Sequence, residues 1–183
     1  MAIYTNSANV ADKGYMVARS SKIKATDSGH LYDLVDMTND VEQGCNIKAG
    51  EFLGTGYQER EALTPAVGDA IIFVCDVPLV YDAYTQGQNA ETNYINVKGK
   101  AFKGYEIVKD DVFGVSANGF TTVVGEIPAK GNYVVVDGNR KWKEVADAPS
   151  AETYGFIGQI IGYEVSEGVK VVLINTIKNE AIA

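Results

Sequence analysis

The chain has 183 residues, 46% of them hydrophobic, and its 16 basic and 24 acidic side chains give a formal net charge of −8. This composition is typical of a globular protein with one well-packed core. The calculated pI of 4.7 and the lack of basic clusters disfavour nucleic-acid binding, because contacts to phosphates need concentrated Lys and Arg. No apolar stretch approaches the roughly 20 residues that cross a bilayer, so we expect no membrane partner.

The first residues show no positively charged region followed by an apolar run, so we expect no secretory signal. The two cysteines, Cys45 and Cys75, are then expected to be free thiols in a reducing cytoplasm.

Residues 1–25 differ from the rest of the chain because they are rich in Ser, Asn, Thr and small side chains with isolated apolar anchors. One interpretation is a poorly ordered terminus, and the other is an extended arm that becomes ordered on a partner. We therefore divide the chain into an N-terminal arm, residues 1–25, and a single β-rich domain, residues 26–183. The anchors that we expect to contact a partner are Ile3, Tyr4, Tyr15 and Met16.

Glycine is frequent, with 19 residues, and many glycines separate short runs of β-branched and aromatic residues. Such runs predict strands. In chain order, the predicted strands are 70–77, 94–97, 105–108, 112–115, 120–124, 133–136, 156–165 and 169–175.

Turn residues at 137–139 predict a hairpin between the strand 133–136 and a further strand at 141–145. Turn residues at 166–168 predict a second hairpin, between the strands 156–165 and 169–175. Helix is expected in few places: a turn at 59–63, a capped turn at 150–154, and residues 30–37, where helix and strand are equally compatible. The sequence therefore predicts a mainly β fold, a compact β-barrel or β-sandwich with little helix and an extended N-terminal arm.

The long polar segment 81–94 carries three tyrosines. Long loops often contact partners, and tyrosine supplies contact area at low entropic cost. We expect a second contact surface here, formed by Tyr81, Tyr84 and Tyr94.

Residues for catalysis are sparse. The only histidine, His30, lies near Asp27 and Asp33, but no Gly-x-Ser-x-Gly elbow presents a serine to it. We expect no catalytic residues.

The same histidine with Asp27, Asp33, Asp36 and Asp40 matches no zinc or EF-hand spacing, so no metal or cofactor is expected. The pair Asp110-Asp111 is interpreted as a solvated turn.

Four segments of the chain, taken in order, follow a pattern that recurs among members of a known protein family. They are the acid-rich turn 39–44, the segment 77–82, the continuous block 93–116 and the segment 156–164 with its closing strand. Together they resemble the head decoration, or cement, proteins of tailed bacteriophages over residues 39–175. The chain departs from that family at Lys103, where related chains place an arginine, and at Asp110-Asp111, where they place a glycine–acid pair.

The resemblance implies a non-enzymatic β-rich virion protein that binds the shell of the major capsid protein. It implies synthesis in the bacterial host cytoplasm, a final position on the capsid surface, and a homo-oligomer, for which a trimer suits three-fold sites. An alternative within the virion is a tail, baseplate or head-fibre-base protein. An alternative outside it is a glycan-binding β-sandwich, with Trp142 and surface tyrosines stacking on sugar rings.

Overall fold

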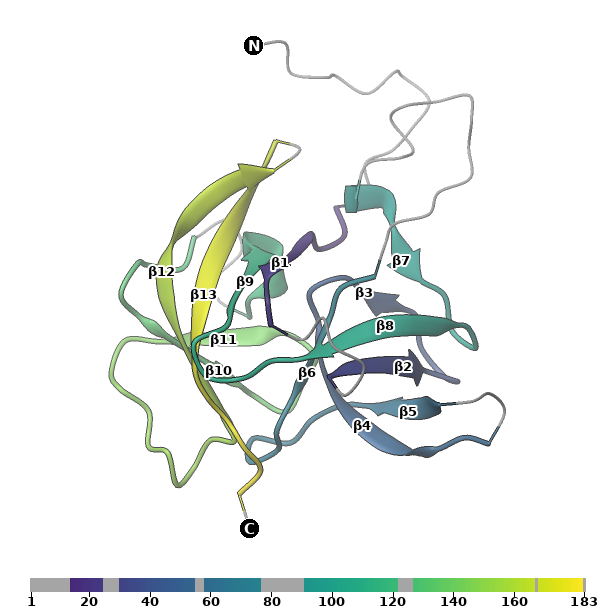
Figure 1. The fold of residues 1–183 in the computed structure, drawn as a ribbon. Coiled ribbons are helices and arrows are strands. Elements are labelled where there is room, and N and C mark those ends of the chain that lie inside the picture. Colours follow the sequence, from purple (N-terminus) through teal and green to yellow (C-terminus); the bar gives the residue numbers. More distant parts are fainter. Residues whose placement is uncertain are drawn as a thin grey trace.

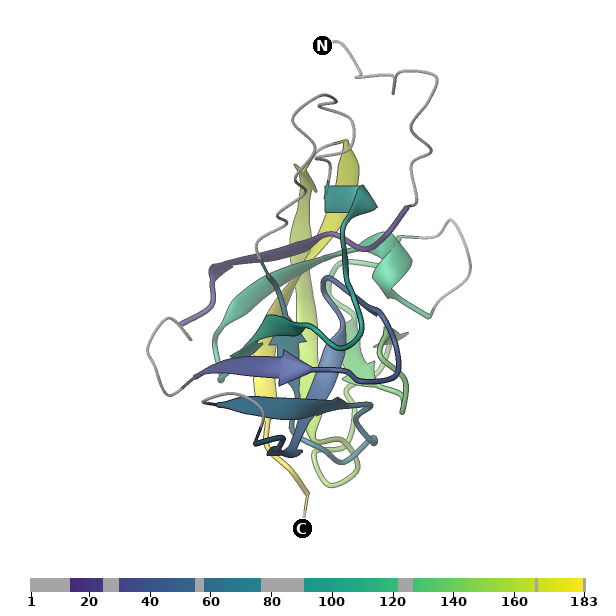
Figure 2. The same cartoon turned by 90° about the vertical axis from the view of Figure 1, so that its right-hand side faces the viewer.

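The computed structural model describes residues 14–24, 30–54, 58–76, 91–121, 127–166 and 168–182 (Figures 1 and 2). These residues form a six-stranded sheet, a closed five-stranded barrel and a two-stranded sheet. The only helical elements among them are two short 3₁₀ turns, η1 (Glu91–Asn93) and η2 (Ala117–Gly119). The prediction of a mainly β fold with little helix is confirmed, and of the two predicted architectures, barrel or sandwich, the structure contains a closed barrel.

The six-stranded sheet is antiparallel throughout and contains both predicted hairpins. Across the sheet, the strands run β1 (Ala18–Lys22), β9 (Val112–Ser116), β13 (Val169–Asn179), β12 (Phe156–Ser166), β10 (Tyr133–Val136) and β11 (Trp142–Val145). Strand β10 pairs with β11, and β12 pairs with β13 as the long hairpin on the left of Figure 1.

Five strands form the barrel. In order around it, they are β2 (Leu31–Val35), β5 (Glu59–Leu63), β4 (Asn46–Phe52), β6 (Ile72–Val74) and β8 (Ala101–Glu106). Strands β2 and β5 pair in parallel, and the other barrel pairs are antiparallel. A short antiparallel pair, β3 (Val41–Glu42) with β7 (Ile95–Asn96), forms the third sheet.

The three segments with helix signals have different outcomes in the structure. Residues 59–63 form strand β5 rather than a helical turn, because this segment pairs with β2 on one side and β4 on the other, and tertiary pairing outweighs local propensity. The ambiguous segment 30–37 contains strand β2. Residues 150–154 form one turn, in which the Tyr154 N–H donates to the Ser150 carbonyl at 3.3 Å.

Strand β6 separates two apolar cores. Because successive side chains of a strand point to opposite faces, Phe73 packs with Ile71 in the core under the six-stranded sheet. Ile72 and Val74 pack in the core of the barrel. This two-sided burial explains why the segment is an unbroken apolar run instead of an alternating one.

The segment that precedes β1 belongs to the fold. Met16 is only 1% exposed and packs in the barrel core, whereas Ala18 packs in the core under the six-stranded sheet. The Val17 N–H donates to Ser116 Oγ at 2.8 Å, and the Ser116 N–H donates back to the Val17 carbonyl at 3.0 Å. Residues 14–24 are therefore not part of a free arm, which corrects the boundary predicted at residue 25; residues 1–13 lie outside the described residues.

Candidate interaction surface

His30 lies on the barrel surface, where its Nδ1 atom is 3.1 Å from Glu106 Oε2. The Tyr32 hydroxyl donates to the same carboxylate oxygen at 3.4 Å. These contacts join the neighbouring strands β2 and β8, because the Glu106 N–H also donates to the His30 carbonyl at 2.8 Å. The histidine thus links two barrel strands at their ends.

The acidic residues near His30 in the sequence make separate contacts. Asp33 pairs with Lys103, Asp36 accepts the N–H groups of Thr38 and Asn39 at 2.7 and 2.8 Å, and Asp40 accepts the Lys98 N–H at 2.9 Å. Asp27 lies outside the described residues. Among the residues that are described, no group of three or more His, Cys, Asp and Glu side chains could hold a metal ion.

Asp111 is buried instead of solvated, which corrects the prediction for the Asp110-Asp111 turn. Its side chain is 0% exposed, and its carboxylate accepts the N–H of Val108 at 3.0 Å and the N–H of Lys24 at 3.2 Å. The carboxylate therefore satisfies two backbone donors where the chain enters β9.

Arg140 connects the β10–β11 hairpin to the barrel. Its guanidinium lies 2.5 Å from Asp36 Oδ2 and also donates to the Ala62 carbonyl at 3.3 Å. Burial by itself would raise the pKa of Asp36, but the N–H groups of Asn39 and Thr38 together with Arg140 outweigh burial and lower it. Asp36 therefore remains ionised in the folded protein at neutral pH.

Trp142 cannot stack on a sugar ring, because its side chain is 0% exposed. It lies in a cluster of aromatic rings, with centroids 5.1 Å from Phe113 and 5.2 Å from Phe156. The buried indole N–H donates to the Gly44 carbonyl at 2.7 Å. The role predicted for Trp142 in glycan binding is therefore wrong.

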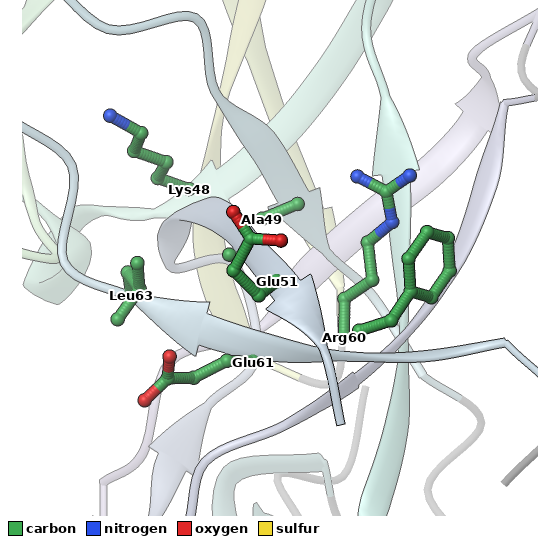
Figure 3. Close-up of a pocket in the computed structure, with 8 residues that line it drawn as sticks. Lys48, Ala49, Glu51, Arg60, Glu61 and Leu63 are labelled. Carbon is green, nitrogen blue, oxygen red and sulfur yellow. The ribbon is translucent and has the colours of Figure 1, made fainter. Parts of the chain in front are cut away.

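A shallow hollow of about 460 Å³ lies over strands β4 and β5. Figure 3 shows Lys48 and Arg60 at opposite ends of it, with Glu51 between them. Both cations have partners: Lys48 Nζ is 2.6 Å from Asp69, and the Arg60 guanidinium lies 4.2 Å from the centroid of the Phe52 ring. The hollow has a mixed, largely compensated charge and no nucleophile–base pair among its lining residues.

The predicted contact residues have different positions in the structure. Met16 is buried and offers no surface to a partner. The Tyr15 N–H donates to the Thr92 carbonyl at 2.9 Å. The half-buried Tyr94 donates its hydroxyl to Asn96 Oδ1 at 3.2 Å, and burial, with a smaller contribution from Asp76, raises its pKa. Tyr15 and Tyr94 therefore both lie next to η1. The remaining predicted residues, Ile3, Tyr4, Tyr81 and Tyr84, lie outside the described residues.

The β12–β13 hairpin carries an exposed apolar patch that the sequence prediction missed. Ile161, Tyr163 and Val165, here called the hairpin patch, are 40%, 36% and 74% exposed. Strand β10 pairs with β12 only through residues 157–159, so the patch lies on the part of β12 beyond that pairing. Alternating apolar residues in this run predict a buried strand face, but the pattern does not reveal which end of the strand extends past its neighbour.

Two contacts fix the side chain of Tyr163. The Tyr163 hydroxyl donates to the Pro128 carbonyl at 2.8 Å, and Lys170 Nζ lies 4.5 Å from the centroid of the Tyr163 ring. Val165, which pairs with Lys170 across the hairpin, is the most exposed of the large hydrophobic residues in the described part of the chain.

An ion cluster lies at the same end of the molecule. Arg19 on β1 is 2.8 Å from Glu91 at the start of η1, and its Nε atom is 3.7 Å from Glu164 on β12. In Figure 1, β1 runs between η1 and the β12–β13 hairpin. We call Arg19, Glu91 and Glu164 the Arg19 cluster.

Comparison with protein-family models finds no match to this sequence, and comparisons with curated proteins and with solved structures also find none. Within the described ranges, no helix combines the length and the apolar character that a membrane span requires.

Proposed function

We propose that this protein is a non-enzymatic virion component that binds the shell of the major capsid protein and stabilises it. The observation that carries the proposal is the hairpin patch, a set of exposed large apolar side chains on β12, in which Tyr163 is fixed by its hydrogen bond to Pro128. Exposed apolar side chains that cluster in this way mark protein interaction sites. The resemblance of residues 39–175 to head decoration proteins supports the choice of partner.

The proposed mechanism is thermodynamic. A protein that binds the assembled shell, and not its dissociated subunits, adds its binding free energy to the assembled state. Repetition over a lattice multiplies a modest contribution, so each copy needs only a small contact area. A trimer would place three hairpin patches around a three-fold or quasi-three-fold position.

The first test is the copy number of the protein in gradient-purified particles from its source, relative to the most abundant coat subunit, by quantitative mass spectrometry. One copy per coat subunit, or a simple fraction of it, supports decoration of the shell. A few copies per particle would instead indicate a tail, baseplate or head-fibre-base protein. Absence from particles would overturn the proposal.

A second test addresses the patch itself. The variant Val165→Asp places a charge in the patch, whereas the matched control Val97→Asp places the same charge at a residue that is 50% exposed and outside the patch. We expect Val165→Asp to weaken binding to particles that lack the protein by at least about tenfold, because a charge buried at an interface core is costly. Equal binding by both variants would exclude the patch as the contact.

A further inference from the structure

The side chain of Arg19 crosses the six-stranded sheet instead of pointing away from it. In the strand registers, Arg19 pairs with Gly114, Gly114 with Leu173, and Leu173 with Gly162. A Cβ atom at Gly114 would lie 3.0 Å from Arg19 Cβ and 2.7 Å from Val171 Cγ1. The glycine therefore leaves room for the arginine to pass over β9 toward β12.

The contacts of Arg19 join three segments that are far apart in the sequence. Its Nη1 atom donates to both carboxylate oxygens of Glu91 at 2.8 Å and to the Ala18 carbonyl at 3.0 Å. Its Nε atom lies 3.7 Å from Glu164. The side chain is 25% exposed, which makes these charged contacts stronger than those of fully solvated pairs.

The Arg19 cluster and the outermost residues of the hairpin patch lie on opposite faces of the hairpin. Gly162 and Glu164 share the face that Arg19 crosses, and Tyr163 and Val165 share the other, because side chains alternate along a strand. Arg19 therefore contacts the hairpin from behind these two residues of the patch, and it connects that rear face to η1.

We infer that Arg19 is a positioning residue for partner binding: by linking Glu164 to Glu91 it braces the hairpin against η1, so that the partner meets the patch in one orientation. This inference rests on the proposed function, with the apolar surface of the shell protein as the partner. Holding the patch in its bound arrangement before binding lowers the conformational entropy that association must otherwise remove.

The test replaces Arg19 and measures motion and binding separately. In Arg19→Met, amide hydrogen exchange should become about tenfold faster in residues 161–166 and 91–96, because local opening of these segments is no longer restrained. The variant Glu164→Gln removes only the hairpin contact and should accelerate exchange in residues 161–166 alone. The control Lys22→Met removes a positive charge from an exposed position of the same strand and should change neither segment.

Binding to particles that lack the protein is then compared at a temperature at which circular dichroism shows every variant to be folded. Several-fold weaker binding by Arg19→Met and Glu164→Gln, with Lys22→Met unchanged, is the expected result. If the wild-type protein binds and Arg19→Met binds equally well, or if exchange in residues 161–166 is unchanged, Arg19 is not a positioning residue. If the wild-type protein itself does not bind, the proposed function fails and the inference fails with it.

Discussion

The indole N–H of Trp142 donates a hydrogen bond of 2.7 Å to the backbone carbonyl of Gly44. Trp142 begins β11 of the six-stranded sheet, and Gly44 lies in the turn between β3 and β4. The bond is fully buried, so it joins the sheet to the barrel side of the molecule where water cannot replace a lost partner.

Replacing Trp142 should show how much its buried packing and its hydrogen bond to Gly44 contribute to the free energy of unfolding. Trp142→Ala should lower the free energy of unfolding by about 3–5 kcal/mol, because it opens a large cavity. Trp142→Phe keeps a ring but leaves the Gly44 carbonyl without its donor, at a cost of about 1–3 kcal/mol. Urea unfolding followed by circular dichroism measures both losses.

The control is Phe52→Ala, which removes a ring that is 62% exposed and should cost at most about 1 kcal/mol. A cost for Trp142→Ala as small as that of this control would contradict the expectation.

The contact between Asp36 and Arg140 should make stability depend on pH in the acidic range. The pKa of Asp36 is lowered in the folded protein, so its contribution is fully present above the pKa of the unfolded carboxyl, about 3.9, and is lost as the pH falls through the folded pKa. Asp36→Asn should therefore cost about 1.5–3 kcal/mol at pH 7, and the difference from wild type should shrink below about pH 4. Chemical denaturation at a series of pH values measures this dependence.

The control Asp137→Asn removes a half-exposed acid paired with Lys143 and should change stability little at any pH. If the cost of Asp36→Asn did not vary with pH, the ionised Asp36 carboxylate would not be the source of that cost.

The two thiols should differ in reactivity. Burial, with a smaller contribution from Glu42, raises the pKa of Cys45 to about 12. Burial also raises the pKa of Cys75, which is less buried. At pH 8 a thiol-specific disulfide reagent should react with Cys45 in the Cys75→Ala variant only as fast as the protein unfolds, because the reacting species is the thiolate. The Cys45→Ala variant, which keeps Cys75, should react faster, and both variants should react rapidly in concentrated guanidinium. Rapid modification of Cys45 in the folded protein would show that its environment is open.

Truncation of the N-terminus should destabilise the fold once it removes the residues that pack before and within β1. Deleting residues 2–20 removes Met16 and the first three residues of β1 and should prevent cooperative unfolding. Met16→Ala alone should cost about 2–5 kcal/mol, because the side chain is buried in the barrel core. Thermal unfolding followed by circular dichroism measures both losses. Full stability of the deletion variant would contradict the position of Met16 in the core.

The elements that could be predicted from the sequence are those with strong local signals. The β10–β11 and β12–β13 hairpins each combine β-branched runs with turn residues, and both form as expected. Strands β4 and β5 were not predicted, because their sequences carry charged and small residues at positions that face solvent. Their strand conformation depends on pairing around the closed barrel, and such long-range pairing leaves little trace in a local pattern.

The sequence allowed even less of the candidate interaction surface to be predicted, because the exposure of its residues depends on how the strands pack. The apolar character of Met16 and Tyr163 is evident from the sequence, but their different exposure depends on tertiary packing. Met16 is buried in the barrel core, and Tyr163 is partly exposed on the part of β12 that extends past its pairing with β10. The role of Gly114 also requires the structure, because its partner in the register, Arg19, is 95 positions earlier in the chain (114 − 19 = 95).

The two-sided burial of β6 has a consequence for the way in which the molecule melts. Because Phe73 and Ile72 are neighbours on one strand but belong to different cores, the barrel cannot open without exposing the underside of the six-stranded sheet. Neither half is therefore free to melt alone, and heating should give one calorimetric peak, with a calorimetric enthalpy equal to the van't Hoff enthalpy. The hairpin patch should therefore keep its arrangement up to the temperature at which both cores unfold together.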